Sequence, residues 1–246
     1  GCLMEGISHE VCSLAGTLRL SKLIAIYDDN GISIDGRVEG WFSDDTAARF
    51  EAYGWEVLRD IDGHDAAAIE AALAVATHNP ERPTLICCRT TIGFGSPGKA
   101  GKASSHGAPL GQEEVAATRQ ALGWSWPSFE IPDVYYEAWN AEARGTERET
   151  AWQALFDRYR QTYPELATEF ERRMAGRLPA DFSAHAEACI ARLQQQAPEV
   201  ASRQASQMVL DMLAPQLPEL IGGSADLSGS NLTTWKGSQS ITEAAG

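Results

Sequence analysis

The stretch that decides the fold is residues 1–32, GCLMEGISHEVCSLAGTLRLSKLIAIYDDNGI. Between Met4 and Leu18 the apolar residues recur with helical spacing, which predicts a helix. Residues 23–27, LIAIY, form a short apolar run bounded by turn residues, which predicts a strand buried on both faces. A polar turn, residues 28–31, follows at once. This order is typical of α/β proteins, which bind ligands where a strand ends.

Both ends of this stretch carry groups suited to a phosphorylated ligand. Gly1 and Cys2 open the helix, and a helix start has free N–H groups and a positive dipole end that can hold a phosphate. Asp28, Asp29 and Asn30 place carboxylate and amide oxygens at the carboxyl end of the strand. Mg²⁺ prefers such oxygens together with phosphate oxygens and water. Taken alone, however, Asp-Asn-Gly after a strand is often no more than a turn, so both interpretations stay open.

The following segments repeat the alternation of helix and strand. Helices are predicted at residues 43–53 and 66–77, and strands at 55–58 and 83–90. Ser43 is the expected N-cap of the first of these helices. Cys87 and Cys88 are neighbours in the last strand, so their side chains should point to opposite faces as small buried residues. Short joints between these elements imply a parallel sheet with helices on both faces.

A long loop, residues 91–110 with the sequence TIGFGSPGKAGKASSHGAPL, follows the last strand. Long loops in compact domains are usually functional lids or disordered segments. Its glycines allow the backbone to approach a ligand closely, and Lys99 and Lys102 add positive charge to an acidic chain. His106 is the only histidine of the loop, and it is either a solvated surface group or a group that moves a proton.

The second half of the chain is mostly helical. Helices are predicted at residues 112–122, 182–196 and 201–213, and a largely helical, charged stretch at 133–176 with breaks at Gly145 and Pro164. The aromatic residues of that stretch favour an apolar packing face over a set that stacks nucleic-acid bases, because the charge around them is mixed and acidic. Arg203 lies in the first turn of its helix, where a cation opposes the helix dipole. Residues 220–231 are expected to form a strand end and a loop of small residues.

Composition limits the classes of function. With 246 residues, 43% of them hydrophobic, the chain can bury a substantial core in one large or two small domains. A net charge of −14 argues against nucleic acid as a general partner, because the phosphate backbone needs a basic face. No apolar run approaches the ~20 residues that span a bilayer, so no membrane association is expected. The five cysteines show no metal-binding spacing and suit a reducing cytoplasm.

Three sequence motifs together resemble one family. Residues 1–10, GCLMEGISHE, residues 28–36, DDNGISIDG, and residues 105–111, SHGAPLG, resemble the transketolases of bacteria, which are thiamine diphosphate enzymes. The resemblance covers the whole chain. It implies a three-layer α/β/α thiamine diphosphate-binding fold with a mostly parallel sheet, a helical connection, and the start of a second α/β domain. The corresponding ranges are 1–130 for the diphosphate-binding domain, 131–197 for the connection, and 198–246 for the start of the pyrimidine-binding domain.

The resemblance also implies an activity and a set of cofactor contacts. Transketolases transfer a two-carbon ketol unit from a ketose phosphate to an aldose phosphate in the pentose phosphate pathway, using thiamine diphosphate and Mg²⁺, with Ca²⁺ or another divalent ion as an alternative. Matching the motifs residue by residue, Gly1 would contact the diphosphate, and Asn30 and the Ile32 carbonyl would bind the metal. His106 would touch cofactor and substrate and act in catalysis. Asp226 would lie near the cofactor of the partner subunit.

Substrate and partner contacts follow from the same resemblance. Arg203 and Ser230 would bind the phosphate of the sugar, with His106 at the reacting end. The implied enzyme is a cytoplasmic homodimer whose active sites form between subunits, with Glu5 and Glu10 at the interface. The family's metal-binding aspartate would precede Gly1, and its catalytic glutamate would follow Gly246. We therefore expect an internal fragment that lacks the N-terminal part and most of the pyrimidine-binding and C-terminal domains, and that has no turnover alone.

Other functions remain open at this point. A related thiamine enzyme, such as dihydroxyacetone synthase or deoxyxylulose-phosphate synthase, is one alternative. The residues of the second and third motifs disfavour deoxyxylulose-phosphate synthase. Assays with different donor and acceptor sugars would distinguish dihydroxyacetone synthase from transketolase. A short product that acts only as a binding subunit is a non-catalytic alternative.

Overall fold

The computed structural model describes residues 1–224 and 226–242. It divides into two compact units. Among the described residues, the first consists of Gly1–Ile131 with Ile241 and Thr242, and the second is Pro132–Ser240. The predicted assignment of residues 1–130, 131–197 and 198–246 to domain roles stays a prediction. Among the described residues, no helix combines the length and apolarity needed to cross a membrane.

The first unit is built on a parallel sheet of three strands, in the order β1-β5-β4. These are β1 (Ile24–Asp29), β4 (Glu56–Asp62) and β5 (Thr84–Arg89). The predicted parallel sheet is therefore confirmed. The central strand, β5, lies between β1 and β4 and is buried from Thr84 to Cys88, because helices cover both of its faces. The same expectation for β1 is wrong: β1 is an edge strand, and its Ile26 side chain is 58% exposed.

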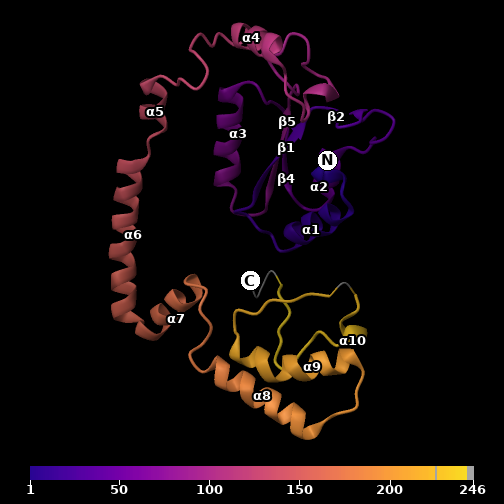
Figure 1. The fold of residues 1–246 in the computed structure, drawn as a ribbon, viewed down its shortest axis with the longest axis vertical. Coiled ribbons are helices and arrows are strands. Elements are labelled where there is room, and N and C mark those ends of the chain that lie inside the picture. Colours follow the sequence, from indigo (N-terminus) through magenta and orange to yellow (C-terminus); the bar gives the residue numbers. More distant parts are fainter. Residues whose placement is uncertain (225, 243–246) are drawn as a thin grey trace. The chain divides into compact units, whose positions relative to one another are not determined.

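Helices cover both faces of this sheet, so the unit has three layers. On one face, α1 (Gly6–Thr17) and α2 (Thr46–Ala52) form a core that contains Phe50, Trp55 and Cys87. On the other face, α3 (Ala66–His78) packs on Ile86 and Cys88 (Figure 1). Cys87 and Cys88 belong to different cores, as their adjacency in a strand predicts. The predicted three-layer α/β/α class is confirmed.

Three local features differ from the expectations. The first helix begins at Gly6, after the short 3-10 helix η1 (Cys2–Met4), rather than at Met4. Helix α2 is capped by the Asp45 side chain, which accepts from the Ala48 N–H at 2.9 Å, so Ser43 is not its N-cap. A small antiparallel hairpin, β2 (Ile32–Ser33) and β3 (Gly36–Arg37), follows β1 and was not predicted. Its two-residue turn is Ile34-Asp35, and Gly36 begins β3 with a φ of +126°, which favours glycine.

The segment after β5 is folded rather than structureless. Residues 91–110 form consecutive turns and one 3-10 helix, η2 (Ala103–Ser105), and α4 (Gln112–Ala121) follows. The Gly101 N–H donates to the Ile92 carbonyl at 2.8 Å, and the Ser96 N–H donates to the Gly93 carbonyl at 3.0 Å. The loop therefore has internal backbone hydrogen bonds of its own.

In the described residues, the second unit is helical. Its elements are α5 (Asp133–Trp139), α6 (Glu142–Thr162), α7 (Pro164–Met174), α8 (Phe182–Gln196), α9 (Ser202–Leu213), η3 (Ala214–Gln216) and α10 (Ser228–Asn231). The expected break at Gly145 is wrong, because a single glycine costs a long helix only ~1 kcal/mol. Pro164 does end α6 and begins α7, since proline suits a first helical turn. Residues 220–224 form no strand, residues 228–231 of the expected loop form the short helix α10, and residue 225 lies outside the described residues.

The aromatic residues of the second unit form a partial cluster. Phe156 is buried, and its ring lies 5.2 Å from Trp152, 5.3 Å from Phe170 and 6.2 Å from Tyr159, measured between ring centres. Trp139, in contrast, is 87% exposed. Trp152 and Phe170 contact Phe156 but remain 50% and 40% exposed, so the interpretation of these aromatic residues as a packing face stays a prediction.

Candidate functional site at the carboxyl end of the sheet

The polar turn after β1 is held in one conformation by hydrogen bonds. The Ile32 N–H donates to Asn30 Oδ1 at 2.9 Å, and Asn30 Nδ2 donates to Asp28 Oδ2 at 3.2 Å. The Thr90 hydroxyl, at the end of β5, donates to Asp28 Oδ1. Asp29 pairs with Arg89 in the register of β1 and β5, which brings the two strand ends side by side. Asn30 is half-buried, so its amide is oriented rather than free.

These groups offer oxygen atoms to a hard cation. Asn30 Oδ1 accepts one hydrogen bond and, as an amide oxygen, has a second lone pair for a metal ion. The Ile32 carbonyl is the other predicted ligand, two residues further along the chain. Within residues 1–224 and 226–242, no group of three or more His, Cys, Asp or Glu side chains could hold a metal ion. A cation here would therefore need oxygens from a ligand or water, which is how Mg²⁺ is commonly bound beside phosphate.

Gly1 is exposed at the start of η1, with open space where a side chain would stand. The turn that it begins is anchored by Arg49, whose guanidinium donates to the Leu3 carbonyl at 3.3 Å and to Asp44 at 2.7 Å. The Arg49 side chain is only 13% exposed, so it is a fixed contact. Sequence reasoning did not predict this role of Arg49, because the partners are far apart in the chain. An exposed glycine at a helical turn fits close approach by an anion.

His106 follows η2 at the far end of the loop after β5. Its imidazole is exposed, and in the described part of the chain it makes no hydrogen bond, so it is available to a ligand. The two lysines of the loop are used internally. Lys99 Nζ donates to the Leu110 carbonyl at 2.9 Å, and Lys102 Nζ donates to the Gly98 carbonyl at 2.7 Å. Because both ammonium groups are hydrogen-bonded to loop carbonyls, Lys99 and Lys102 are less available to bind a ligand than the sequence suggests.

His64 is a site residue that sequence reasoning did not single out. Its Nε2 accepts from the Thr91 N–H at 2.8 Å, and its ring stacks on Phe94 with ring centres 3.9 Å apart. A side chain on the neighbouring Gly63 would come within 2.4 Å of Thr90 Cγ2. The loops after β4 and β5 are thus packed against each other. The available signal was position, because parallel strands end at the same edge and His64 follows β4 directly.

The second unit brings two other predicted residues together. Arg203, in the first turn of α9, donates from Nη1 to the Ser230 carbonyl at 3.3 Å. The contact uses the backbone of Ser230 and leaves its exposed hydroxyl available. Asp226 is also exposed, and its φ of +54° is rare for a residue with a side chain. Arg203 and Ser230 could therefore present a cation and a hydroxyl to one anion.

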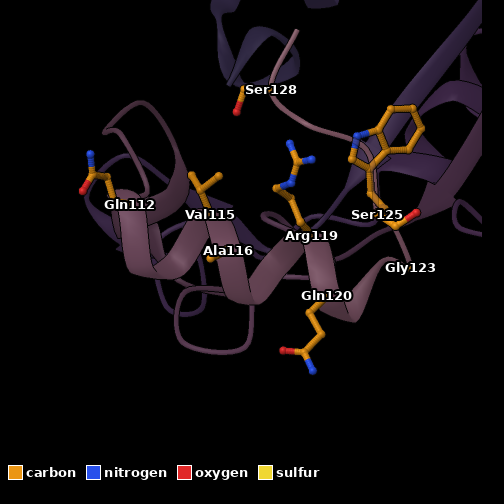
Figure 2. Close-up of a pocket in the computed structure, with 9 residues that line it drawn as sticks. Gln112, Val115, Ala116, Arg119, Gln120, Gly123, Ser125 and Ser128 are labelled. Carbon is orange, nitrogen blue, oxygen red and sulfur yellow. The ribbon is translucent and has the colours of Figure 1, made fainter. Parts of the chain in front are cut away.

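A separate hollow of about 670 Å³ lies beside α4 and contains none of the predicted site residues (Figure 2). Val115, Ala116 and Arg119 line it from one face of the helix, and Ser125 and Ser128 from the segment that follows. The hollow is therefore distinct from the strand-end site.

Comparison with known proteins identifies the family. The family described as transketolase, thiamine diphosphate binding domain, matches residues 1–179. The chain belongs to the transketolase family. It is 59% identical over 245 residues to Transketolase 1 of Escherichia coli, and 60% identical over 241 residues to Transketolase 1 of Vibrio vulnificus. The expected family is confirmed, and with it a thiamine diphosphate-binding fold.

A solved transketolase has the same fold. The enzyme from Pichia stipitis, determined in complex with sedoheptulose-7-phosphate, superposes with a TM-score of 0.83 at 41% identity over 96% of this chain. The chain spans 37% of the length of the Escherichia coli transketolase and 35% of the Pichia stipitis chain. It therefore corresponds to little more than a third of these relatives.

Proposed function

We propose that this chain forms part of a transketolase that transfers a two-carbon ketol unit from a ketose phosphate to an aldose phosphate. The observation that carries the proposal is 59% identity to a transketolase over the full chain. The oriented Asn30 at the carboxyl end of the parallel sheet supports it, because that edge is where such folds bind their cofactors.

In this proposal the strand-end residues hold thiamine diphosphate and its metal ion. Asn30 Oδ1 and the Ile32 carbonyl bind Mg²⁺, or Ca²⁺ or another divalent ion in its place. Gly1 offers its backbone to the diphosphate, and Asp226 approaches the cofactor of a partner subunit. The bound cofactor supplies an electron sink for the carbon atom that is transferred. The chain's own contribution is to orient the ligands through the fixed amide of Asn30.

In this proposal the sugar phosphate is bound by Arg203, Ser230 and His106. Arg203 presents a planar fork of donors, which suits a phosphate, and the Ser230 hydroxyl adds another donor. The exposed imidazole of His106 donates a hydrogen bond to cofactor and substrate and moves a proton at the reacting end. Sugar phosphates as ligands of the Pichia stipitis transketolase support this substrate class.

The proposed assembly is a cytoplasmic homodimer with active sites between its subunits. An exposed apolar stripe on the N-terminal segment supports the dimer: Ile7, Val11 and Leu14 are 68%, 58% and 57% exposed, at helical spacing along α1. Glu10 lies on the same helix and Glu5 at its N-cap, where the resemblance places carboxylates between subunits. All five cysteines are free thiols, which supports the cytoplasm.

Substitution of Asn30 tests the proposal. In the complete gene product that carries this sequence, Asn30→Ala should weaken metal-dependent binding of thiamine diphosphate by about tenfold or more, because ligand and orientation are lost together. Asn140→Ala is the matched control, since Asn140 Oδ1 accepts from the N–H two residues on, as Asn30 does, at 2.9 Å. Titration calorimetry with the cofactor measures both. Equal affinities of the two variants, or no ketol transfer by the unmodified product, would contradict the proposal.

A further inference from the structure

A carboxylate on α4 is bonded into the loop that carries His106. Glu114, in the first turn of α4, accepts a hydrogen bond from the Ser96 hydroxyl and another from the Gly98 N–H at 2.7 Å. Ser96 is buried, with 3% of its surface exposed, and its oxygen also accepts from the Lys99 N–H at 3.1 Å. One side chain is therefore hydrogen-bonded to the loop segment between Ser96 and Lys99, directly at Ser96 and Gly98 and through the Ser96 hydroxyl at Lys99. We call Glu114, Ser96, Gly98 and Lys99 the Glu114 clamp.

At several glycines of the loop, an added Cβ would force a neighbouring side chain to shift. A Cβ on Gly98 would lie 2.7 Å from Glu114 Oε2, and one on Gly95 would lie 2.6 Å from Leu122 Cδ2. On Gly93 it would lie 2.9 Å from Ser105, the residue before His106. The glycines of this loop thus serve packing of the loop on α4 and on itself.

From the clamp, contacts lead to both sides of His106. Lys99 Nζ donates to the Leu110 carbonyl at 2.9 Å and to the Pro109 carbonyl at 3.2 Å, beyond the histidine. Before the histidine, Lys102 Nζ donates to the Gly98 carbonyl at 2.7 Å, and the Ser105 hydroxyl donates to the Lys102 carbonyl at 2.8 Å. The position of His106 therefore depends on the clamp.

The acceptor of the clamp is an ionised carboxylate. The hydrogen bond from the Ser96 hydroxyl, followed by that from the Gly98 N–H, lowers the pKa of Glu114, so the charged acceptor persists at neutral pH. A glycine-rich loop of this length has little apolar core of its own and would otherwise sample many conformations. Anchoring by the charged Glu114 acceptor is the physical reason that the loop keeps a single conformation.

We propose that Glu114 is a positioning residue: the Glu114 clamp holds the loop in one conformation, so that His106 is presented to ligands already in place. The clamp does not touch the substrate and acts only through His106. The proposal rests on the proposed function, in which His106 contacts cofactor and substrate. The loop is accordingly a preformed platform, and its role is preorganisation.

Hydrogen exchange tests whether the clamp orders the loop. In the complete gene product, Glu114→Ala should cause a loss of exchange protection at the amides of Gly101, Ser105 and His106, which are bonded within the loop and do not contact Glu114. Glu113→Ala is the matched control, because Glu113 lies in the same first turn of α4. It removes the same favourable helix-dipole charge and leaves the clamp in place. Equal protection in the two variants overturns the proposal.

Steady-state kinetics test whether the ordering of the loop positions His106. Glu114→Ala should lower kcat/KM for sugar phosphates by about tenfold or more, and Glu114→Gln, which keeps an acceptor oxygen for Gly98, should restore part of it. In a His106→Ala background, Glu114→Ala should have little further effect, because residues that act as one unit are not additive. Full additivity overturns the positioning role. An unchanged kcat/KM in His106→Ala alone refutes the proposed role of His106, and the exchange measurement still decides the clamp.

The substitution Gly98→Ala tests the role of the clamp without replacing Glu114. Its methyl group would displace the Glu114 carboxylate, and the same loss of protection at Ser105 and His106 is expected. If either variant fails to fold, the other provides the comparison. Protection in Gly98→Ala equal to that of the unmodified protein overturns the proposal.

Discussion

Replacing Gly16 with alanine should destabilise the first unit, although the same change in an open helix is stabilising. Gly16 lies near the end of α1, where the backbone passes directly over the end of α2. A methyl carbon there would lie 1.8 Å from the Tyr53 carbonyl oxygen and 3.3 Å from Trp55 Cδ1. Since real Cβ atoms keep at least 3.0 Å from such neighbours, the two elements must separate by more than about 1 Å.

The magnitude follows from two opposing effects. Overpacking a tight contact costs about 1–3 kcal/mol, and the upper end applies because the obstacle is backbone that cannot rotate away. Alanine in place of glycine within a helix is favourable by about 1 kcal/mol. The net expectation is a loss of about 2 kcal/mol in the free energy of local opening of α1.

Native-state hydrogen exchange measures this opening for individual amides. The Leu18 N–H, which donates to the Leu14 carbonyl at 2.9 Å, reports on the end of α1. Gly145→Ala in α6 is the control, because nothing lies within 4 Å of its Cβ position, and it should stabilise its helix by about 1 kcal/mol. A stabilising effect of Gly16→Ala would refute the close packing of α1 on α2.

Three further predictions concern the cores and the charges. Phe50→Ala should lower the free energy of unfolding by about 3–5 kcal/mol in a urea titration, because Phe50 is 1% exposed, whereas Phe129→Ala at a fully exposed position should have little effect. Burial, and then the nearby Asp29 charge, raises the pKa of the Cys87 thiol to about 11. Cys87 should therefore resist alkylation at neutral pH, whereas the exposed Cys2 should react. The free energy of unfolding should fall as the pH rises from 9.0 to about 11, because the Cys87 thiol ionises at lower pH in the unfolded chain than in the folded one. Hydrogen bonds from Arg172 and Arg173 lower the pKa of Glu169 to about 2. Its contribution to stability, present above pH 4.5, should therefore be lost as the pH falls toward 2. An acid titration of Glu169→Gln should lack this pH dependence.

Much of the architecture is predictable from local sequence. The apolar run around Leu85 and Cys88, bounded by Pro83 and the polar residues after Arg89, indicates the central strand without reference to any other segment. Helix α8 has the predicted bounds, because apolar spacing and the breaks on each side are local signals. Misjudged positions, such as Gly145 and the cap of α2, are those where several local signals compete.

The candidate site was only partly predictable. Asn30 and His106 stand in recognisable motifs, so residue type and spacing were sufficient to single them out. Thr90, His64, Arg49 and Glu114 carry no comparable local mark. Their partners lie 16 to 62 residues away, and only the folded chain brings them together.

Residue order alone indicates most of the helices and the three strands of the parallel sheet, because hydrophobic periodicity and turn residues act over a few neighbouring positions. Which strand is buried, how the turn after β1 is oriented and how the loop of His106 is held depend on tertiary contacts. Ile26, on the edge strand β1, is exposed, and Glu114 reaches Gly98 because α4 folds back on the loop. Such contacts join residues distant in sequence, and their geometry is set by packing and hydrogen bonding in the folded state.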